Sequence, residues 1–313
     1  MKALALFALL WVLPACLAER ADTSIERVHL GPGAATGSTG WEALRRSFRT
    51  RNPGYDLSWQ PRLATRTDVF RSEVFFIQTG EGELSLSGAG RAPVRSKVAV
   101  GDLVLLRPGE RLEVQGEIGA LCVVVPAPPP AELPAFIRPD WDPALTDTPG
   151  GCATETGAYR RILLTWLGKN GPYLYHALNA HRVRITDSFS HYHPVRGGFD
   201  ELYLVQMAGP EARLIVSERV DLIESPESVS RQEAGELLSE IRLRAGDLVL
   251  LPRGTMHRGL GGVLAQVITV PGFVPGAEIG VDHHLKAINE RLGLEAGEAL
   301  PFHEEAASAR VVK

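Results

Sequence analysis

The chain has 313 residues, 44% of them hydrophobic, so it is long enough to bury the core of one large or two medium-sized domains. Its formal net charge of -4 offers no basic field for a phosphate backbone, which argues against nucleic acid as a partner. The 32 glycines and 22 prolines, with few aromatic residues, favour short strands joined by tight turns over a helical bundle.

The first twenty residues, MKALALFALLWVLPACLAER, have the pattern of a signal peptide. Lys2 is the basic start, residues 3–13 form an apolar run too short to span a bilayer, and small residues precede a cut after Ala18. The sequence therefore predicts a signal peptide over residues 1–18 and an exported protein, periplasmic or extracellular, without a membrane span. The letters LPAC also resemble a bacterial lipobox, which would make Cys16 a lipid anchor.

Two cysteines, Cys122 and Cys152, follow this segment. In an oxidising compartment the two can form a disulfide. The alternative is that Cys122, inside the apolar run ALCVVVP, is simply a small buried residue. The sequence leaves both interpretations open.

Two segments of the chain resemble each other and predict a duplicated domain. The first contains SEVFFIQTG and then GDLVLLRPGERL; the second contains DELYLVQMAG and then GDLVLLPRGTMH. In each copy a Glu opens an apolar strand that ends in Gln, over residues 73–78 and 201–206. Short apolar strands bounded by Gly and Pro are typical of antiparallel sandwiches and jelly rolls, so we expect an all-β fold.

These patterns divide the chain after the signal peptide into four segments. We expect an N-terminal β domain over residues 19–125, a C-terminal β domain over residues 161–275 and a tail over residues 276–313. Residues 126–160 begin with PAPPPAELP, whose prolines prevent continuous strand pairing, so this segment is predicted to be a linker.

Two helices are expected in the second half of the chain. The stretch SRQEAGELLSEI, residues 230–241, has helix-forming residues within an insertion of the second copy. In the tail, Leu285, Ile288 and Leu292 recur at helical spacing, and Gly293 is placed to end the helix.

The second copy also carries residues that can bind a metal. In the stretch SFSHYHPVRGGFDELYLVQ, His191 and His193 are two apart and face the same side of a strand, and Glu201 opens the next strand. His257 follows a Pro-x-Gly turn after the second GDLVLL strand. Three neutral imidazoles and one carboxylate suit a divalent first-row metal and leave positions open for water, dioxygen or substrate. Asp200 is the alternative carboxylate.

The segment around His257 resembles the second motif of the cupin superfamily, Gly-x5-Pro-x-Gly-x2-His. Gly246, Pro252, Gly254 and His257 match this motif without a gap. The chain departs from the family where Gly261 stands in place of the usual Asn.

The stretch around His191 resembles the first cupin motif, a His-x-His followed by Glu. His191, His193 and Glu201 fill it, with a longer loop than the family norm. The mature chain thus resembles a two-domain cupin, or bicupin. That resemblance implies a duplicated cupin-type jelly-roll β-barrel (double-stranded β-helix), to which the helical spacing in the tail adds a short C-terminal helix. It also implies that His191, His193, Glu201 and His257 bind one divalent transition metal: Fe, Mn, Ni or Zn.

The first copy departs from the metal pattern. Counting back from Glu73 by the spacing of the second copy gives Leu63 and Thr65 where histidines would stand, and Leu112 stands in place of His257. Since only Glu73 remains, we expect the first copy to bind no metal.

Two residues near the expected ligands are candidates for catalysis. Arg196 lies in the Gly-rich loop and can clamp a carboxylate substrate, although a solvated loop charge is the alternative. Tyr203 shares the face of Glu201 by strand parity and can offer a phenol to the pocket or fill the barrel wall. Phe189 has the parity of the ligands and is expected to line the pocket.

The family resemblance implies several functions. A metal in an apolar β-barrel can act as a Lewis acid or activate dioxygen, so we expect a metalloenzyme of the dioxygenase, decarboxylase or isomerase type. Its substrate would be a small polar, carboxylate or phenolic molecule. The alternative is a non-catalytic cupin that binds a sugar or another small molecule around a structural metal. The expected partner is therefore a small-molecule ligand or substrate, and a homodimer is one assembly that the sequence allows.

Overall fold

The structure, a computed structural model, describes residues 24–31, 37–67, 70–88, 90–151 and 159–313. The predicted signal peptide, the predicted anchor at Cys16 and the disulfide partner Cys152 lie outside these residues. Cys122 itself is buried, with 1% of its surface exposed. Within the described ranges, no helix is long and apolar enough to cross a membrane.

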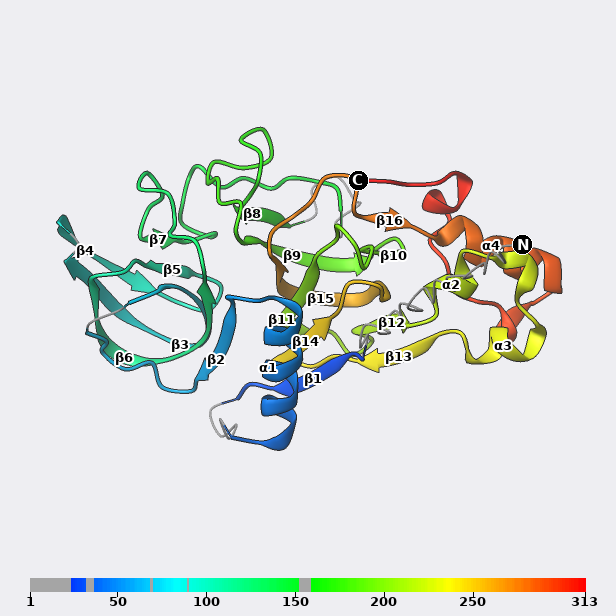
Figure 1. Cartoon of the computed structure of the whole chain (residues 1–313), viewed down its shortest axis with the longest axis horizontal. Helices are drawn as coiled ribbons and strands as arrows, with labels where there is room; N and C mark the ends of the chain where they lie inside the picture. Colours follow the sequence, from blue (N-terminus) through cyan, green and yellow to red (C-terminus); the bar gives the residue numbers. More distant parts are fainter. Residues whose placement is uncertain (1–23, 32–36, 68–69, 89, 152–158) are drawn as a thin grey trace, which may run out of the picture.

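The described chain folds into two antiparallel sheets, each of which curls into a barrel (Figure 1). The N-terminal sheet has the strand order β2-β6-β3-β5-β7, with β4 paired to β3. Its strands are β2 (Asp56–Gln60), β3 (Ser72–Gly88), β4 (Arg91–Val98), β5 (Leu103–Leu106), β6 (Glu110–Val125) and β7 (Phe136–Ile137). The predicted all-β, duplicated jelly-roll fold is confirmed.

The C-terminal sheet has ten strands, with the main order β1-β14-β11-β15-β10-β16. The strands β9 and β12 also pair with β15, and β8 and β13 join them at the edges. Their bounds are β1 (Glu26–His29), β8 (Arg160–Leu164), β9 (Asn179–Asp187), β10 (His191–Tyr192), β11 (Asp200–Ala208), β12 (Arg213–Ser217), β13 (Ser239–Arg242), β14 (Asp247–Leu251), β15 (Met256–Val270) and β16 (Ile279–Gly280). Because β1 pairs with β14, residues near the start of the chain add a strand to the C-terminal sheet.

The repeated GDLVLL motif makes the same turn in both barrels. Gly101 and Gly246 have φ angles of 102° and 92°, in a region that glycine reaches without steric cost. The following Asp accepts a hydrogen bond from the backbone N–H three residues upstream, at 2.9 Å for Asp102 and 3.1 Å for Asp247. The verbatim repeat in the sequence therefore reflects one turn that is built twice.

The two barrels pack against each other through the same faces of equivalent strands. Apolar residues from β3, β5 and β6 meet those from β11, β14 and β15 in a single buried cluster. Its members include Val74, Phe76, Leu103, Leu105, Leu121, Val123, Leu202, Leu204, Leu248, Leu250, Ile268 and Val270. The helix α1 (Thr39–Arg51) adds Trp41, Leu44 and Phe48 to it. Alternate residues of these strands, such as Phe75 and Tyr203, face their own barrel interiors.

The predicted linker is mostly irregular where it is described. Between β6 and β8, its described residues contribute the strand β7, which pairs with β5 at the edge of the N-terminal sheet. The Tyr175 hydroxyl, beyond the linker, donates a hydrogen bond of 2.6 Å to the carbonyl of Ala127. The linker is thus tied to the C-terminal half as well as to the N-terminal barrel.

Both expected helices are present. The insertion contains α2 (Val220–Ile223) and α3 (Arg231–Glu236), and α3 starts with a capping box between Ser230 and Glu233. The helix α3 ends earlier than the predicted stretch, since residues 239–242 form β13 and pair with β12. Three short 3-10 turns occur at Pro226–Ser228, Ala296–Glu298 and Glu305–Ser308.

The tail helix is α4 (Asp282–Leu292). Leu285 and Ile288 are fully buried on one of its faces, as their helical spacing predicts. Gly293 ends the helix in the left-handed conformation, with φ 58°.

Candidate functional site

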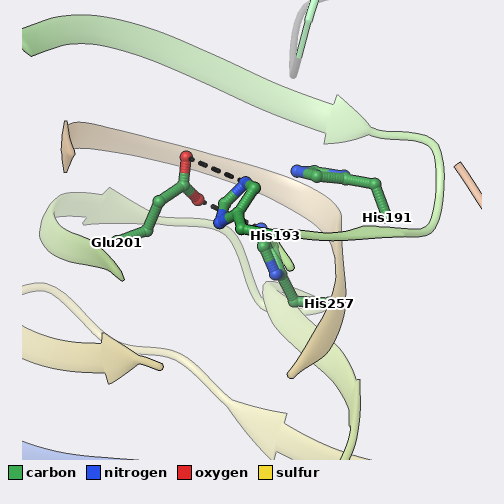
Figure 2. A group of neighbouring side chains, drawn as sticks. All are labelled: His191, His193, Glu201 and His257. Carbon is green, nitrogen blue, oxygen red and sulfur yellow. Dashed lines mark ion pairs between the residues drawn. The ribbon is translucent and has the colours of Figure 1, made fainter. Parts of the chain in front are cut away.

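Four residues with metal-ligating side chains meet inside the C-terminal barrel (Figure 2). His191 lies on β10 directly opposite His257 on β15, in antiparallel register. His193 follows β10, and Glu201 lies on β11. The strands of the barrel therefore bring together residues from three segments that are well separated in sequence.

A tight turn places His257. The strand β14 ends before Pro252, and Gly254 adopts a φ of 93° that other residues rarely reach. The backbone N–H of Gly254 donates a hydrogen bond of 2.6 Å to the carbonyl of His193. The turn thus fixes β15, with His257 near its start, to the segment that carries His193.

The four side chains are close and buried. One ligand atom from each lies within 4.8 Å of all the others, and the exposed fractions run from 0% to 5%. The Glu201 carboxylate approaches His257 Nε2 at 3.0 Å through Oε2 and His193 Nε2 at 3.9 Å through Oε1. Figure 2 shows the glutamate and the imidazoles turned toward one common point.

Backbone carbonyls orient the imidazoles. The Nδ1 atom of His191 lies 3.1 Å from the carbonyl of Phe189, and that of His257 lies 3.4 Å from the carbonyl of Thr255. A backbone hydrogen bond with Phe199 holds His193. When Nδ1 donates its proton to a carbonyl, the lone pair of a neutral imidazole is on Nε2, which is the arrangement that metal-binding histidines use.

The Nε2 atoms then need a cation. All three are buried without a hydrogen-bond partner, and so is Glu201 Oε2. Lone pairs that face a carboxylate in a buried site repel it unless a positive charge lies between them. Three imidazole nitrogens and one carboxylate oxygen are suitable donors for a divalent first-row ion, so the residues present fit a metal.

Burial keeps two of these histidines neutral. It lowers the pKa of His191 and of His193 well below the usual value, and the neighbouring His257 adds to the effect. Neutral imidazole is the form that ligates a metal. The site is therefore poised for binding at neutral pH.

Asp200, the alternative carboxylate, has a different role. Arg51 of α1 and Arg253 bind it at 3.0 Å and 2.9 Å, and Asn52 donates a further hydrogen bond of 2.8 Å. These hydrogen bonds and charges lower the pKa of the Asp200 carboxyl despite its burial. Asp200 anchors α1 to the C-terminal barrel, and Glu201 faces the histidines.

Aromatic rings cover the ligand group. Phe189 stacks on His191 with ring centroids 4.5 Å apart, and Phe199 lies 3.9 Å from His193. Phe273 continues this layer at 5.2 Å from Phe199. The position of Phe189 agrees with its predicted strand parity.

The two predicted catalytic residues lie in different surroundings. Tyr203 is fully buried in the barrel, with its ring centroid 6.1 Å from that of His257. Arg196 is exposed on the loop between His193 and β11. The structure thus brings Tyr203 to the ligand group and leaves Arg196 at the surface; catalytic roles for both stay predictions.

Two residues beside the site were missed by the sequence analysis. Glu278 is buried, and its Oε1 lies 3.4 Å from His191 Nε2. Burial, followed by the charge of Glu201, raises the pKa of Glu278 to about 7. Lys313 places its ammonium 4.3 Å from the ring centroid of Phe189. Neither residue belongs to a local motif, because only the pairing of β16 with β10 brings this part of the chain to the site.

No family model matches the chain, and no curated protein matches it. Solved structures do match. One is a variant of Bacillus subtilis oxalate decarboxylase, with a TM-score of 0.50 and 12% identity over 86% of this chain and 82% of that chain. Another is a structure of the same enzyme from work on its Mn(II) centres, with a TM-score of 0.47 and 12% identity over 92% of this chain and 84% of that chain. With its two matching barrels and one group of three histidines and a glutamate among the described residues, this chain has the fold of a two-domain cupin.

Proposed function

We propose that this protein is a metal-dependent cupin enzyme that removes a carboxyl group from a small carboxylic acid as carbon dioxide. The observation that carries the proposal is the group of four buried ligand atoms within 4.8 Å of one another. The fold is shared with an oxalate decarboxylase, which supports decarboxylation as the reaction type without fixing the substrate.

His191, His193, Glu201 and His257 would hold the ion. A divalent ion there supplies positive charge that stabilises the negative charge formed when the carbon–carbon bond breaks. Four protein ligands leave positions for a substrate on an octahedral ion, whereas they fill a tetrahedral zinc site. Iron, manganese or nickel therefore suits catalysis better than zinc.

The remaining residues exclude water and handle the proton. The rings of Phe189 and Phe199 cover two of the imidazoles, and a site without bulk water strengthens charge interactions. When the bond breaks, its electron pair stays on the carbon that remains, and carbon dioxide leaves. The Glu278 carboxyl group, 3.4 Å from His191 Nε2, would give its proton to that carbon and would then be protonated again from solvent. The reaction needs no oxidant or reductant.

The test is carbon dioxide release from a panel of mono- and dicarboxylic acids. Protein purified without a metal-affinity tag is loaded with Mn, Fe, Ni or Zn and compared with chelated protein. We expect release from at least one acid by loaded protein and none by chelated protein. The matched control is His176→Ala, which removes an exposed histidine outside the ligand group. Loaded protein that binds an acid and leaves it intact would overturn the enzyme and support the non-catalytic binding cupin.

The proton-transfer role of Glu278 has its own test. Glu278→Gln preserves volume and removes the transferable proton, so we expect the rate of release to fall about a hundredfold, in the range of general acid catalysis. Metal content per chain should not change, since Glu278 is outside the group of four ligands. An unchanged rate contradicts the assignment of the proton to Glu278.

Export remains a prediction from residues 1–18, which lie outside the described part of the chain. Intact mass of the protein made in its own cells distinguishes the two interpretations of this segment. A chain that begins after Ala18 supports simple secretion, and a diacylated chain that begins at Cys16 supports a lipid anchor.

A further inference from the structure

The segment that ends at Lys313 is held beside the metal-ligand group. The N–H of Gly280 on β16 donates a hydrogen bond of 2.8 Å to the carbonyl of Val311, and Val312 forms a bridge with Ile279. Two hydrogen bonds, of 3.0 Å and 3.2 Å, join the backbones of Lys313 and Glu278. Figure 1 shows this end of the chain returning to β16. The backbone of Lys313 is therefore fixed one strand away from β10.

A glycine makes the close approach of this segment feasible. A side chain on Gly280 would place its Cβ 2.9 Å from the Cβ of Val311 and 3.4 Å from Phe189. Gly280 lies directly opposite His191 in the β10–β16 register. The segment thus packs tightly against the strand pair that carries a ligand.

The side chain of Lys313 places its charge over the aromatic ring that stacks on a ligand. The ammonium lies 4.3 Å from the Phe189 ring, and that ring in turn stacks on the imidazole of His191 at 4.5 Å. One aromatic ring therefore separates the cation from the ligand. The charge of Lys313 also acts on two groups of the site: it adds to the burial that lowers the pKa of His191, and it opposes the burial that raises the pKa of Glu278.

Two arginines near the site are already paired, and Lys313 is different. Arg253 binds Asp200 at 2.9 Å, and Arg258 binds Asp187 at 2.7 Å. Among the described residues, no carboxylate forms an ion pair with the Lys313 ammonium, which contacts a neutral ring instead. Lys313 is exposed, so an incoming anion can reach it.

We propose that Lys313 is a substrate-recognition residue of the C-terminal barrel, and that it binds a carboxylate group of the ligand beside the Phe189 ring that stacks on His191. The inference rests on the proposed function for the identity of the site and adds a substrate class to it. A small dicarboxylate can place one carboxylate at the ion and the other at Lys313, so dicarboxylates are preferred over monocarboxylates of the same length.

The test measures binding as well as turnover. Lys313→Met retains the stem that covers Phe189 and removes the charge, and Lys313→Arg keeps the charge. The matched control is Lys97→Met, which removes an exposed cation from β4 of the other barrel. Calorimetry gives the Kd of metal-loaded protein for malonate and for propionate, and metal content and Tm are measured for each variant.

We expect Lys313→Met to raise the Kd and KM for the dicarboxylate about fivefold at low salt, the upper range of an exposed ion pair. Its kcat, metal content and Tm should stay close to those of the unaltered chain. Lys313→Arg should restore most of the affinity, and the difference should shrink as salt is added. The Kd for propionate should change much less.

Three outcomes overturn the inference: an unchanged Kd for malonate in Lys313→Met, an equal loss in Lys97→Met, or no binding of malonate by the unaltered protein. A loss of metal or Tm that parallels the loss of affinity also overturns it, because Lys313 would then be structural. Binding that depends on Lys313 without any carbon dioxide release leaves the recognition role standing and removes the decarboxylase. Carbon dioxide release that does not depend on Lys313 leaves the decarboxylase standing and removes the recognition role.

Discussion

The two barrels share a fold and differ in the residues that surround one glutamate. In the C-terminal barrel His191 stands opposite His257, and in the N-terminal barrel Arg66 stands opposite Leu112. Each barrel has a glutamate on the equivalent strand, and in the N-terminal barrel the Arg66 guanidinium binds Glu73 at 3.2 Å. A largely buried carboxylate needs a positive charge nearby. In the N-terminal barrel Arg66 supplies that positive charge, and in the C-terminal barrel a bound metal ion would supply it.

The rest of the N-terminal site has become apolar core. Leu63 and Leu112 are buried among Phe75, Ile77 and Leu106, so the space that could receive a ligand is filled by side chains. The Arg66 guanidinium lies 5.4 Å over the ring of Phe75. The comparison teaches that strand pattern maintains the cupin barrel, while a few interior positions decide whether it holds a metal.

The largest expected effect comes from removing two of the proposed metal ligands, which should abolish the difference in metal binding between the barrels. His191→Ala with His193→Ala should reduce bound metal from about one equivalent to near zero, because half of the ligand group is lost. The Tm of this variant in the presence of metal should fall to that of the chelated protein, since metal binding stabilises the folded state by mass action.

Elemental analysis and thermal melts check this prediction, with His176→Ala as the histidine control. A double variant that retains its metal would place the ion elsewhere. A stoichiometry near two in the unaltered protein would mean that the N-terminal barrel or another region also binds metal, contrary to the contrast between Arg66 and His191.

The next largest effect concerns Asp200, for which the N-terminal barrel has Ser72 at the equivalent position. Asp200→Asn removes the buried negative charge that Arg51 and Arg253 both bind. We expect a loss of about 3 kcal/mol in the free energy of unfolding, as is usual when one partner of a buried ion pair is removed. Urea unfolding measures it, and Asp221→Asn, an exposed carboxylate on α2, is the control that should stay within about 0.5 kcal/mol.

Much of the fold and of the ligand group could be predicted from the sequence, because the features that signal them lie close together along the chain. The Gly–Asp turn, the two-apart histidines and the Pro-x-Gly turn before His257 each lie within a few residues, so their geometry is set by strand alternation and turn chemistry. The choice of Glu201 over Asp200 came from comparison with Glu73 and is the arrangement that the structure has.

Positions set by distant pairing could not be predicted in this way. Ten positions separate His191 from Glu201, but seven separate Arg66 from Glu73, so counting back from Glu73 by the spacing of the second copy does not reach the residue opposite Leu112. Of the two positions that this count gives, Thr65 is exposed and Leu63 is buried in the barrel interior. Glu278 and Lys313 reach the site through β16, whose two residues carry no periodic signal from which pairing could be inferred.

A smaller effect sharpens the comparison within the N-terminal barrel. Arg66→Met removes the cation beside Glu73, and we expect a loss of about 1–2 kcal/mol because the carboxylate is partly desolvated. Adding Glu73→Leu should recover most of that loss, which a double-mutant cycle measures by urea unfolding. An additive cycle would mean that the Arg66–Glu73 pair contributes no coupling, and that the guanidinium is not the counterpart of the metal.

The last prediction uses pH to separate the barrels in metal-free protein. Residues 37–125 contain no histidine, whereas burial holds the pKa of His181, His191 and His193 well below its usual value in the C-terminal barrel. Below the histidine pKa of about 6.5 in the unfolded chain, these histidines bind protons in the unfolded state and stay neutral in the folded barrel. The free energy of unfolding therefore decreases as the pH is lowered, by up to about 1.4 kcal/mol per pH unit for each histidine. The pKa of Glu278 is raised to about 7 in the folded barrel, so protonation of Glu278 stabilises the folded state as the pH is lowered. This gain offsets the loss from roughly one histidine.

The C-terminal barrel should therefore lose stability between about pH 6.5 and pH 5.5, while the N-terminal barrel changes little over the same interval. Hydrogen exchange of chelated protein, corrected for the intrinsic pH dependence of exchange, should show β9, β11 and β15 opening more often and β3 and β6 unchanged. Equal changes in both barrels would mean that they unfold as one unit through their shared core. Loss in β3 and β6 alone would contradict the assignment of the pH response to the buried histidines.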